Sequence, residues 1–313
     1  MKAFVTGVAG QLGYDIVREL EKRKISYVGS DVKALDDMAN GGWNKDTYIA
    51  LDITDEAAVQ QVILQVKPDV VFHCAAWTAV DAAEEEENQA IVKKVNEEGT
   101  KNIAKACQQT GAKMVYISTD YVFDGQGETP WEADCKEYAP LNVYGASKLA
   151  GELAVSELLE KYFIVRIAWV FGQNGNNFIK TMLRLGQSHK ELRVVCDQIG
   201  TPTYTYDLAR LLVDMAQTEK YGYYHATNEG GYISWYEFAK EIFEQAVELG
   251  HAEYKDVTVQ PVTTAEYGAS KAARPFNSRL QKDKLKQQGF TQLPTWQDAL
   301  KRYLGGLSWD RLQ

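Results

Sequence analysis

A tyrosine and a lysine stand four positions apart, at Tyr144 and Lys148, within the stretch NVYGASKLAGE. Side chains at positions i and i+4 of a helix are neighbours, so a helix here would place the phenol beside the ammonium. A neighbouring positive charge favours the phenolate, and a tyrosine tuned in this way can exchange a proton near neutral pH. Reduction of a ketone needs such an acid, because hydride reaches carbon while oxygen takes a proton. By spacing alone, the two residues are equally an ordinary surface pair.

A hydroxyl pair, Ser118 and Thr119, ends the strand-like run KMVYIS that precedes this helix. Parallel sheets bind ligands at the carboxyl ends of their strands. A hydroxyl at that edge can hydrogen-bond a substrate carbonyl beside Tyr144. The order of strand-end hydroxyl and Tyr-x-x-x-Lys therefore predicts a proton-transfer site.

The stretch TGVAGQLG, residues 6–13, follows a strand-like run and opens an amphipathic helix pattern. Glycines in such a loop permit a tight turn, a close approach to a pyrophosphate and close packing of the helix on the strand. The helix N-terminus then offers unpaired N–H groups to the phosphates. The alternative is a glycine-rich turn without a ligand. The candidate cofactor residues in this loop are Gly7, Gly10, Gln11, Leu12 and Gly13.

An acid, Asp31, ends the next strand-like run. It can accept hydrogen bonds from the adenosine ribose hydroxyls and would repel a 2′-phosphate, which favours NAD over NADP. Lys33 lies close enough to offset part of that repulsion. Asp52 and Ile53 follow a later strand and are candidates to meet the adenine, although Asp52 also suits a turn or helix cap in DITDE.

Strand-like runs alternate with helical patterns through the first half of the chain. This alternation predicts an α/β fold with a doubly wound parallel sheet of the Rossmann type. We expect a dinucleotide-binding domain over residues 1–171, with a returning segment near 200–230. Residues 172–313 would then be mainly a smaller, mixed substrate-binding lobe. Within it, Ser234 and Glu237 form the pattern of a helix capping box.

Composition excludes several classes of function. The chain has 313 residues and a net charge of -9, which argues against nucleic-acid or anionic-membrane partners. No segment approaches the roughly 20 apolar residues of a membrane span, and the N-terminus lacks a signal-peptide pattern. We therefore expect a cytoplasmic protein with a small-molecule substrate. Reduced thiols, not disulfides or a zinc site, are expected for the scattered Cys74, Cys107, Cys135 and Cys196.

These motifs together make the sequence resemble the extended short-chain dehydrogenase/reductases. The resemblance runs nearly end to end, through TGVAGQLG, LDITD, PDVVFHCAAWTAVDAAE, STDYVFDG, PLNVYGASKLAGE, RIAWVFG, GNNFIKTML, DQIGTPT and ARPFNSRL. AAWTAVDAAE and STDYVFDG are typical of a ketoreductase branch that separates from the epimerases and dehydratases. The resemblance implies hydride transfer from NADPH or NADH to the C4 ketone of dTDP-4-dehydro-β-L-rhamnose, giving dTDP-L-rhamnose.

The resemblance also implies roles for particular residues. Tyr144 would be the acid, Thr119 would orient the ketone oxygen, and Lys148 would lower the pKa of the tyrosine and hold the ribose. Cys74, Ala75 and Ala76 would line the dinucleotide. The residues expected at the deoxysugar are Thr78, Val80, Asp120, Tyr121 and Trp169, the last of which is alternatively an aromatic core residue. Asn177 and Arg274 are candidates for the substrate pyrophosphate; Lys180, Arg184 and Arg279 are further candidates that also suit a solvated surface.

Some members of this family are described as dimers bridged by a metal held by acidic residues. Here Asp15 stands where a glutamate is expected, and Tyr206 stands where an acid is expected. We therefore predict no metal requirement, and a monomer or weak homodimer. Two other functions stay open: an epimerase or dehydratase, for which Tyr121 replaces the second acid, and a non-catalytic dinucleotide-binding subunit.

Overall fold

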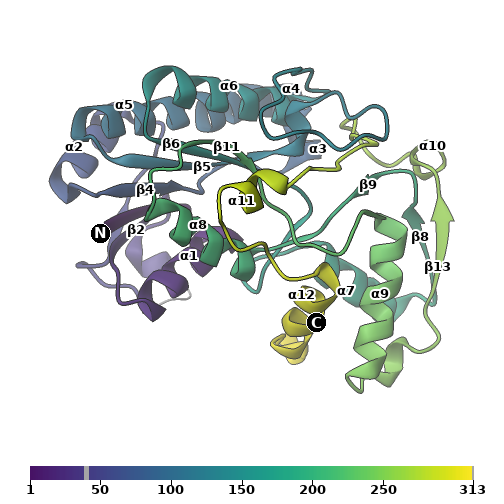
Figure 1. Cartoon of the computed structure of the whole chain (residues 1–313). Helices are drawn as coiled ribbons and strands as arrows, with labels where there is room; N and C mark the ends of the chain where they lie inside the picture. The colour runs from purple at the N-terminus through teal and green to yellow at the C-terminus, as the bar shows by residue number, and fades with distance from the viewer. Residues whose placement is uncertain (39–41, 312–313) are drawn as a thin grey trace.

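Seven parallel strands form the central sheet of the computed structural model, which describes residues 1–38 and 42–311 (Figure 1). The order across the sheet is β11-β6-β5-β4-β1-β2-β3, so the strand order reverses between β1 and β4. This arrangement confirms the predicted doubly wound α/β fold. The strands are β1 (Lys2–Thr6), β2 (Ser26–Asp31), β3 (Tyr48–Ala50), β4 (Val70–His73), β5 (Lys113–Thr119), β6 (Tyr162–Ile167) and β11 (Gly222–His225).

Helices cover both faces of the sheet, and the side chains of each strand point alternately to one face and to the other. In β1, Phe4 packs with the helices of one face, whereas Ala3 and Val5 pack with those of the other. Helices α1 (Gln11–Lys22) and α8 (Thr205–Ala216) cover the second face. The first face is covered by α2 (Glu56–Val66), α5 (Thr100–Thr110) and α6 (Val143–Leu158) (Figure 1).

The long helical segment over residues 86–110 contains one wider turn. It consists of α4 (Glu86–Lys93), a π-helical segment η2 (Lys94–Gly99) and α5. Asn96, inside the π-helical segment, is buried and bonds both backbone groups of Trp77 and the Ser147 hydroxyl of α6. Such single π turns often lie at functional sites, and this one ties the segment after β4 to the helix that carries Tyr144.

A smaller lobe has its own apolar core, in which Phe171, Phe238 and Trp296 are buried. Its helix α9 starts with the predicted capping box of Ser234 and Glu237, which is confirmed. The helices of this lobe are α7 (Phe178–Ser188), α9 (Trp235–Glu248), α10 (Thr264–Tyr267) and α12 (Trp296–Gly305), whereas α11 (Asp283–Gln287) packs on β11 and buries Leu285 in the core of the central sheet. Three two-stranded sheets pair β7 (Val170–Phe171) with β10 (Thr203–Tyr204), β9 (Ile199–Gly200) with β12 (Ile233–Ser234), and β8 (Glu191–Val195) with β13 (Thr258–Val262).

The two lobes interleave along the chain. After the segments β7 to β10, the chain returns to the first lobe, where α8 packs beside α1 and β11 pairs with β6. The division at residues 171 and 172 stays a prediction, and residues 312–313 of the proposed second lobe lie outside the described residues. Within residues 1–38 and 42–311, no helix is both long and apolar enough to cross a bilayer.

Candidate active site and dinucleotide site

The glycine loop after β1 is shaped by close backbone contacts. Gly7 has φ +71°, and a Cβ there would lie 2.6 Å from the Ala75 backbone nitrogen. Gly10 precedes α1 without a capping side chain, so the N–H groups of the first turn stay available to a ligand. Gly13 lies against the Gly7 carbonyl and lets α1 pack closely on the loop. Asn174 of the smaller lobe donates to the Ala9 and Gly10 carbonyls.

A pocket of about 450 Å³ opens at the carboxyl ends of β1, β2, β3 and β4. Asp31 stands at its edge, where its carboxylate accepts hydrogen bonds from Ala9 N (3.0 Å) and Val32 N (2.9 Å). Asp52 also lines the pocket and accepts from Thr54 N, so it fills the turn role and faces the pocket at once. The predicted cofactor residues that line this pocket are Gly7, Gly10, Asp31, Asp52, Ile53, Cys74, Ala75 and Ala76. Gln11, Leu12 and Gly13 lie in the first turn of α1 beside it.

A buried hydrogen-bond chain fixes the floor of this pocket. The Thr100 hydroxyl donates to the Asn96 carbonyl, so His73 Nε2 must donate to Thr100. Burial and the Lys148 charge lower the pKa of His73 to about 3, which keeps the ring neutral. Its Nδ1 therefore accepts from the Thr6 hydroxyl, which in turn accepts the N–H groups of Cys74 and Ala75 (both 3.1 Å). The chain fixes the segment after β4 against β1.

Thr119 and Tyr144 meet at the carboxyl end of β5. Asn142 begins α6 by accepting from Gly145 N at 2.7 Å, and Tyr144 lies in the first turn. Burial and the neighbouring Asp120 charge raise the pKa of the Tyr144 phenol, against a smaller lowering by the adjacent Thr119. The phenol is therefore protonated at neutral pH. The Tyr121 ring packs edge-on against it, with centroids 5.6 Å apart.

Lys148 lies one turn further along α6 and is only 3% exposed. Its Nζ lies 4.2 Å from the centroid of the Tyr116 ring. Burial lowers the pKa of Lys148 to about 7, while Glu152 and Cys74 act in the opposite direction. The expected lowering of the tyrosine pKa by Lys148 stays a prediction, because the groups that shift Tyr144 here are Asp120 and Thr119.

Asp120 connects the strand end to the C-terminal part of the chain. One of its carboxylate oxygens accepts from the Thr119 hydroxyl (3.0 Å), and the other accepts from the Ser278 hydroxyl. Burial raises the pKa of Asp120 to about 6, against the effect of these two donors. The segment around residue 278 is thereby held over the end of β5.

The predicted substrate residues are more dispersed. Arg274 forms a two-point ion pair with Asp81 at 3.0 and 2.7 Å, so its guanidinium is already engaged. Asn177 caps α7 and donates to Gln11, Gly172 and Tyr303 (3.2, 2.9 and 3.1 Å), which joins the two lobes. Thr78 is exposed, and Val80 is half-buried at the start of a short helix, α3 (Val80–Ala83).

Trp169 has φ +51°, a left-handed conformation that is rare for a residue with a side chain. Its ring stacks on Trp235 with centroids 3.7 Å apart and also packs on Gly200, where a Cβ would lie 2.9 Å from it. The ring is half-buried, so the structure leaves room for both the sugar-facing and the core roles of Trp169.

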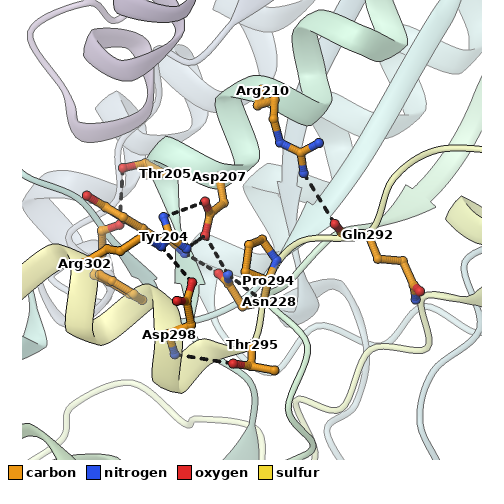
Figure 2. A network of polar contacts seen from close by, with 11 residues as sticks. Tyr204, Thr205, Asp207, Arg210, Asn228, Gln292, Pro294, Thr295, Asp298 and Arg302 are labelled. Atoms are coloured by element: carbon orange, nitrogen blue, oxygen red, sulfur yellow. Dashed lines mark hydrogen bonds and ion pairs between the residues drawn. The ribbon is translucent and has the colours of Figure 1, made fainter.

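Asp15 and Tyr206 line a second hollow of about 460 Å³, beside the polar network of Figure 2. Asp15 accepts from the Thr205 hydroxyl, and the charged neighbours in this hollow are Arg18 and Arg302. In the part of the chain that the structure describes, no group of three or more His, Cys, Asp or Glu could hold a metal ion. This donor set is therefore unsuited to a metal.

Several residues at the site are absent from the sequence-based prediction. Ser30 lines the dinucleotide pocket, and its buried hydroxyl has no hydrogen-bond partner among the described residues. Asn142, which also donates to the Ala273 carbonyl, has the residue type of a helix cap and could have been found from that signal. Asn174 and Ser278 act through contacts with distant loops, which no local pattern reveals.

The sheet order, glycine loop and Thr119–Tyr144–Lys148 set define an extended short-chain dehydrogenase/reductase. The family described as RmlD substrate binding domain matches residues 1–308, and this chain belongs to it. The dTDP-4-dehydrorhamnose reductase of Aggregatibacter actinomycetemcomitans is 40% identical, over 96% of this chain and 97% of that protein. The spore coat polysaccharide biosynthesis protein SpsK of Bacillus subtilis is 37% identical, over 97% and 96%.

Solved structures agree with this assignment. The dTDP-4-dehydrorhamnose reductase from Bacillus anthracis, crystallised in complex with NADP, has a TM-score of 0.84 and is 42% identical, over 96% of this chain and 98% of that one. A Thermus thermophilus UDP-glucose 4-epimerase in complex with NAD has a TM-score of 0.79 at 21% identity, over 97% and 98%, and shares the fold.

Proposed function

We propose that this chain uses NADPH or NADH to reduce the C4 ketone of dTDP-4-dehydro-β-L-rhamnose to dTDP-L-rhamnose. The observation that carries the proposal is the meeting of Thr119 and Tyr144 at the strand edge beside the dinucleotide pocket. Relatives named dTDP-4-dehydrorhamnose reductase, similar to this chain over nearly its full length, support the choice of substrate.

The dinucleotide suits the residues of the pocket. Gly7 leaves a cradle that a Cβ would fill, the first turn of α1 offers uncapped N–H groups, and the buried Ser30 hydroxyl lacks a partner among the described residues. The reduced nicotinamide supplies hydride to the substrate carbon. When the cofactor is bound, Asp31 would accept hydrogen bonds from the adenosine ribose hydroxyls, and Lys148 would donate to the nicotinamide ribose.

Tyr144 acts as the general acid. Its raised pKa means that the phenol holds its proton at neutral pH, ready to give it to the ketone oxygen. Thr119 orients that oxygen. As the phenolate forms, the buried Lys148 ammonium stabilises it, because opposite charges attract strongly in a site from which water is excluded. Tyr144 then regains a proton from solvent.

The test mixes purified protein with dTDP-4-dehydrorhamnose and either NADH or NADPH, and follows oxidation of the reduced nicotinamide. We expect turnover by the wild type and about a 10²- to 10³-fold lower kcat for Tyr144→Phe, since general acids contribute rate factors of this size. Tyr162→Phe is the matched control, because Tyr162 lies at the amino end of β6, whereas the site lies at the carboxyl ends of the strands. Undiminished turnover by Tyr144→Phe would exclude it as the acid. Absence of oxidation despite cofactor binding would exclude this substrate and favour an epimerase or a regulatory subunit.

A further inference from the structure

Three charged side chains are buried next to the catalytic residues. Lys148 is 3% exposed, and Glu152 and Arg166 are fully buried. Glu152 follows Lys148 by one turn of α6, and Arg166 lies on the adjacent strand β6. Charges are rarely buried to this degree unless they are paired, because removal from water costs several kcal/mol per ion. The reduction itself uses only Lys148, so the other two need an explanation.

The guanidinium group of Arg166 has hydrogen-bond partners on every side. Its Nε and Nη2 donate to the two carboxylate oxygens of Glu152, both at 2.8 Å. Its remaining N–H groups reach the Ala133 carbonyl (3.2 Å) and the Tyr138 hydroxyl (3.1 Å). The guanidinium also lies within 5.4 Å of three ring centroids, those of Phe123, Tyr138 and Tyr223. Since arginine keeps its charge in proteins, this arrangement keeps Glu152 ionised in the interior.

The Lys148 ammonium has far fewer polar partners than the Arg166 guanidinium. Its Nζ makes no hydrogen bond or ion pair within the described parts of the chain, and it lies over the Tyr116 ring. His73, which faces it from β4, is neutral, and the Tyr144 phenol is protonated. Cys74 is a thiol whose pKa burial raises to about 12, so it carries no charge. Glu152 is thus the ionised acid that acts on Lys148.

We propose that Glu152, kept ionised by Arg166, is a positioning residue for the reduction: it keeps the buried Lys148 ammonium charged. The inference rests on the proposed function, in which charged Lys148 meets the cofactor ribose and stabilises the phenolate. Arg166 balances Glu152 without touching Lys148. The pair therefore acts on the chemistry through charge, from behind the catalytic helix.

A purely structural role for the ion pair makes a different prediction. In that case its loss would weaken the fold but would leave the titration of Lys148 unchanged. The direct measurement is an NMR titration of the Lys148 13Cε resonance in lysine-labelled protein, assigned by its disappearance in Lys148→Met. This measurement needs no substrate, so it succeeds or fails independently of the proposed activity.

We expect Glu152→Gln to lower the pKa of Lys148 by about one unit or more, which leaves at least tenfold less ammonium at alkaline pH. In the assay, the alkaline limb of the kcat profile should move to lower pH by the same amount, with kcat restored on acidification. Glu152→Asp should recover part of the shift. Glu19→Gln is the matched control, because Glu19 is also a buried, arginine-paired glutamate but lies on α1; it should leave both titrations unchanged.

Glu152→Gln leaves Arg166 buried without its counter-ion and could prevent folding. The double variant Glu152→Gln/Arg166→Met removes both charges, an exchange that buried ion pairs tolerate. It should still lower the pKa of Lys148, but by less than the single variant does, because the positive charge of Arg166 is removed together with the carboxylate. If either variant folds and Lys148 titrates as in the wild type, the proposal is overturned.

Discussion

Asp207 and Arg302, 95 residues apart in the chain, form a two-point ion pair between α8 and α12, at 2.9 and 2.7 Å (Figure 2). Asn228 adds a third donor to Asp207, at 2.9 Å, and also bonds Tyr204 N and the Pro294 carbonyl. Asp207 is buried, whereas Arg302 is about one-third exposed. Since α8 packs beside α1, the pair connects the C-terminal helix with the helix that follows the glycine loop.

The two partners of this pair should not be equivalent in a stability experiment. Arg302→Ala leaves a buried carboxylate with Asn228 as its remaining side-chain donor, so it should cost about 2–4 kcal/mol of unfolding free energy. Asp207→Ala should cost less, because Arg302 can turn to water. Urea unfolding measures both, with the exposed Lys301→Ala as control. Equal costs for the two variants would contradict this account.

Cofactor choice should depend on Asp31 and Lys33 in opposite directions. Asp31→Asn removes the charge that repels a 2′-phosphate, so the ratio of kcat/KM for NADPH to that for NADH should rise about tenfold. Lys33→Met removes a positive charge from the same pocket edge and should lower the ratio. The measurement is the pair of kcat/KM values for each variant. A shift of both ratios in one direction would show that charge at this edge does not set the preference.

Stability should depend on pH through Asp15, whose pKa burial raises to about 6. The folded chain then holds this proton more tightly than the unfolded chain, so the contribution of Asp15 to stability falls as pH rises from about 4 to about 6. Asp15→Asn removes the buried charge and can still accept from Thr205. It should therefore raise stability at neutral pH by roughly 1–3 kcal/mol. Thermal unfolding across this pH range tests the point, with the exposed Asp256→Asn as control; an unchanged pH slope would contradict it.

Chelation should leave turnover unchanged. The hollow beside Asp15 offers arginines and tyrosines, which are poor ligands for a hard divalent cation. Activity and molar mass in solution, measured with and without EDTA, test both the metal and a metal-bridged dimer. Loss of activity, or dissociation of a dimer on chelation, would show that acidic ligands are assembled in some other way.

Local patterns predicted the sheet, which the structure confirms, and most of the candidate site residues. The glycine spacing, the strand-end Asp31 and the Tyr144–Lys148 spacing each depend on neighbours within one strand, turn or helix. The π-helical segment at Lys94–Gly99 escaped this reasoning, because one widened turn hardly changes a helical pattern. Asn96, inside it, acts through contacts that only the folded chain brings together.

The substrate side was harder for a physical reason. Arg274 is read from the sequence as a free cation, yet its partner Asp81 stands 193 positions away. Asn177 was expected to face the substrate, but its polar atoms cap α7 and join the lobes. The Ser278 contact with Asp120 spans 158 positions. These relationships depend on which loops meet across the lobes, and spacing along the chain does not encode that meeting.

The return of the chain to the central sheet at β11 also limits how such an enzyme can be altered. The segment between β6 and β11 leaves the sheet, contributes to the smaller lobe and then comes back to protect the edge of β6. Replacement of the smaller lobe by that of a relative would therefore require several matched junctions. A chain cut after β6 would expose the unpaired backbone of that strand, which is a template for aggregation. New substrate preferences in this architecture are more accessible through changes within loops than through exchange of a module.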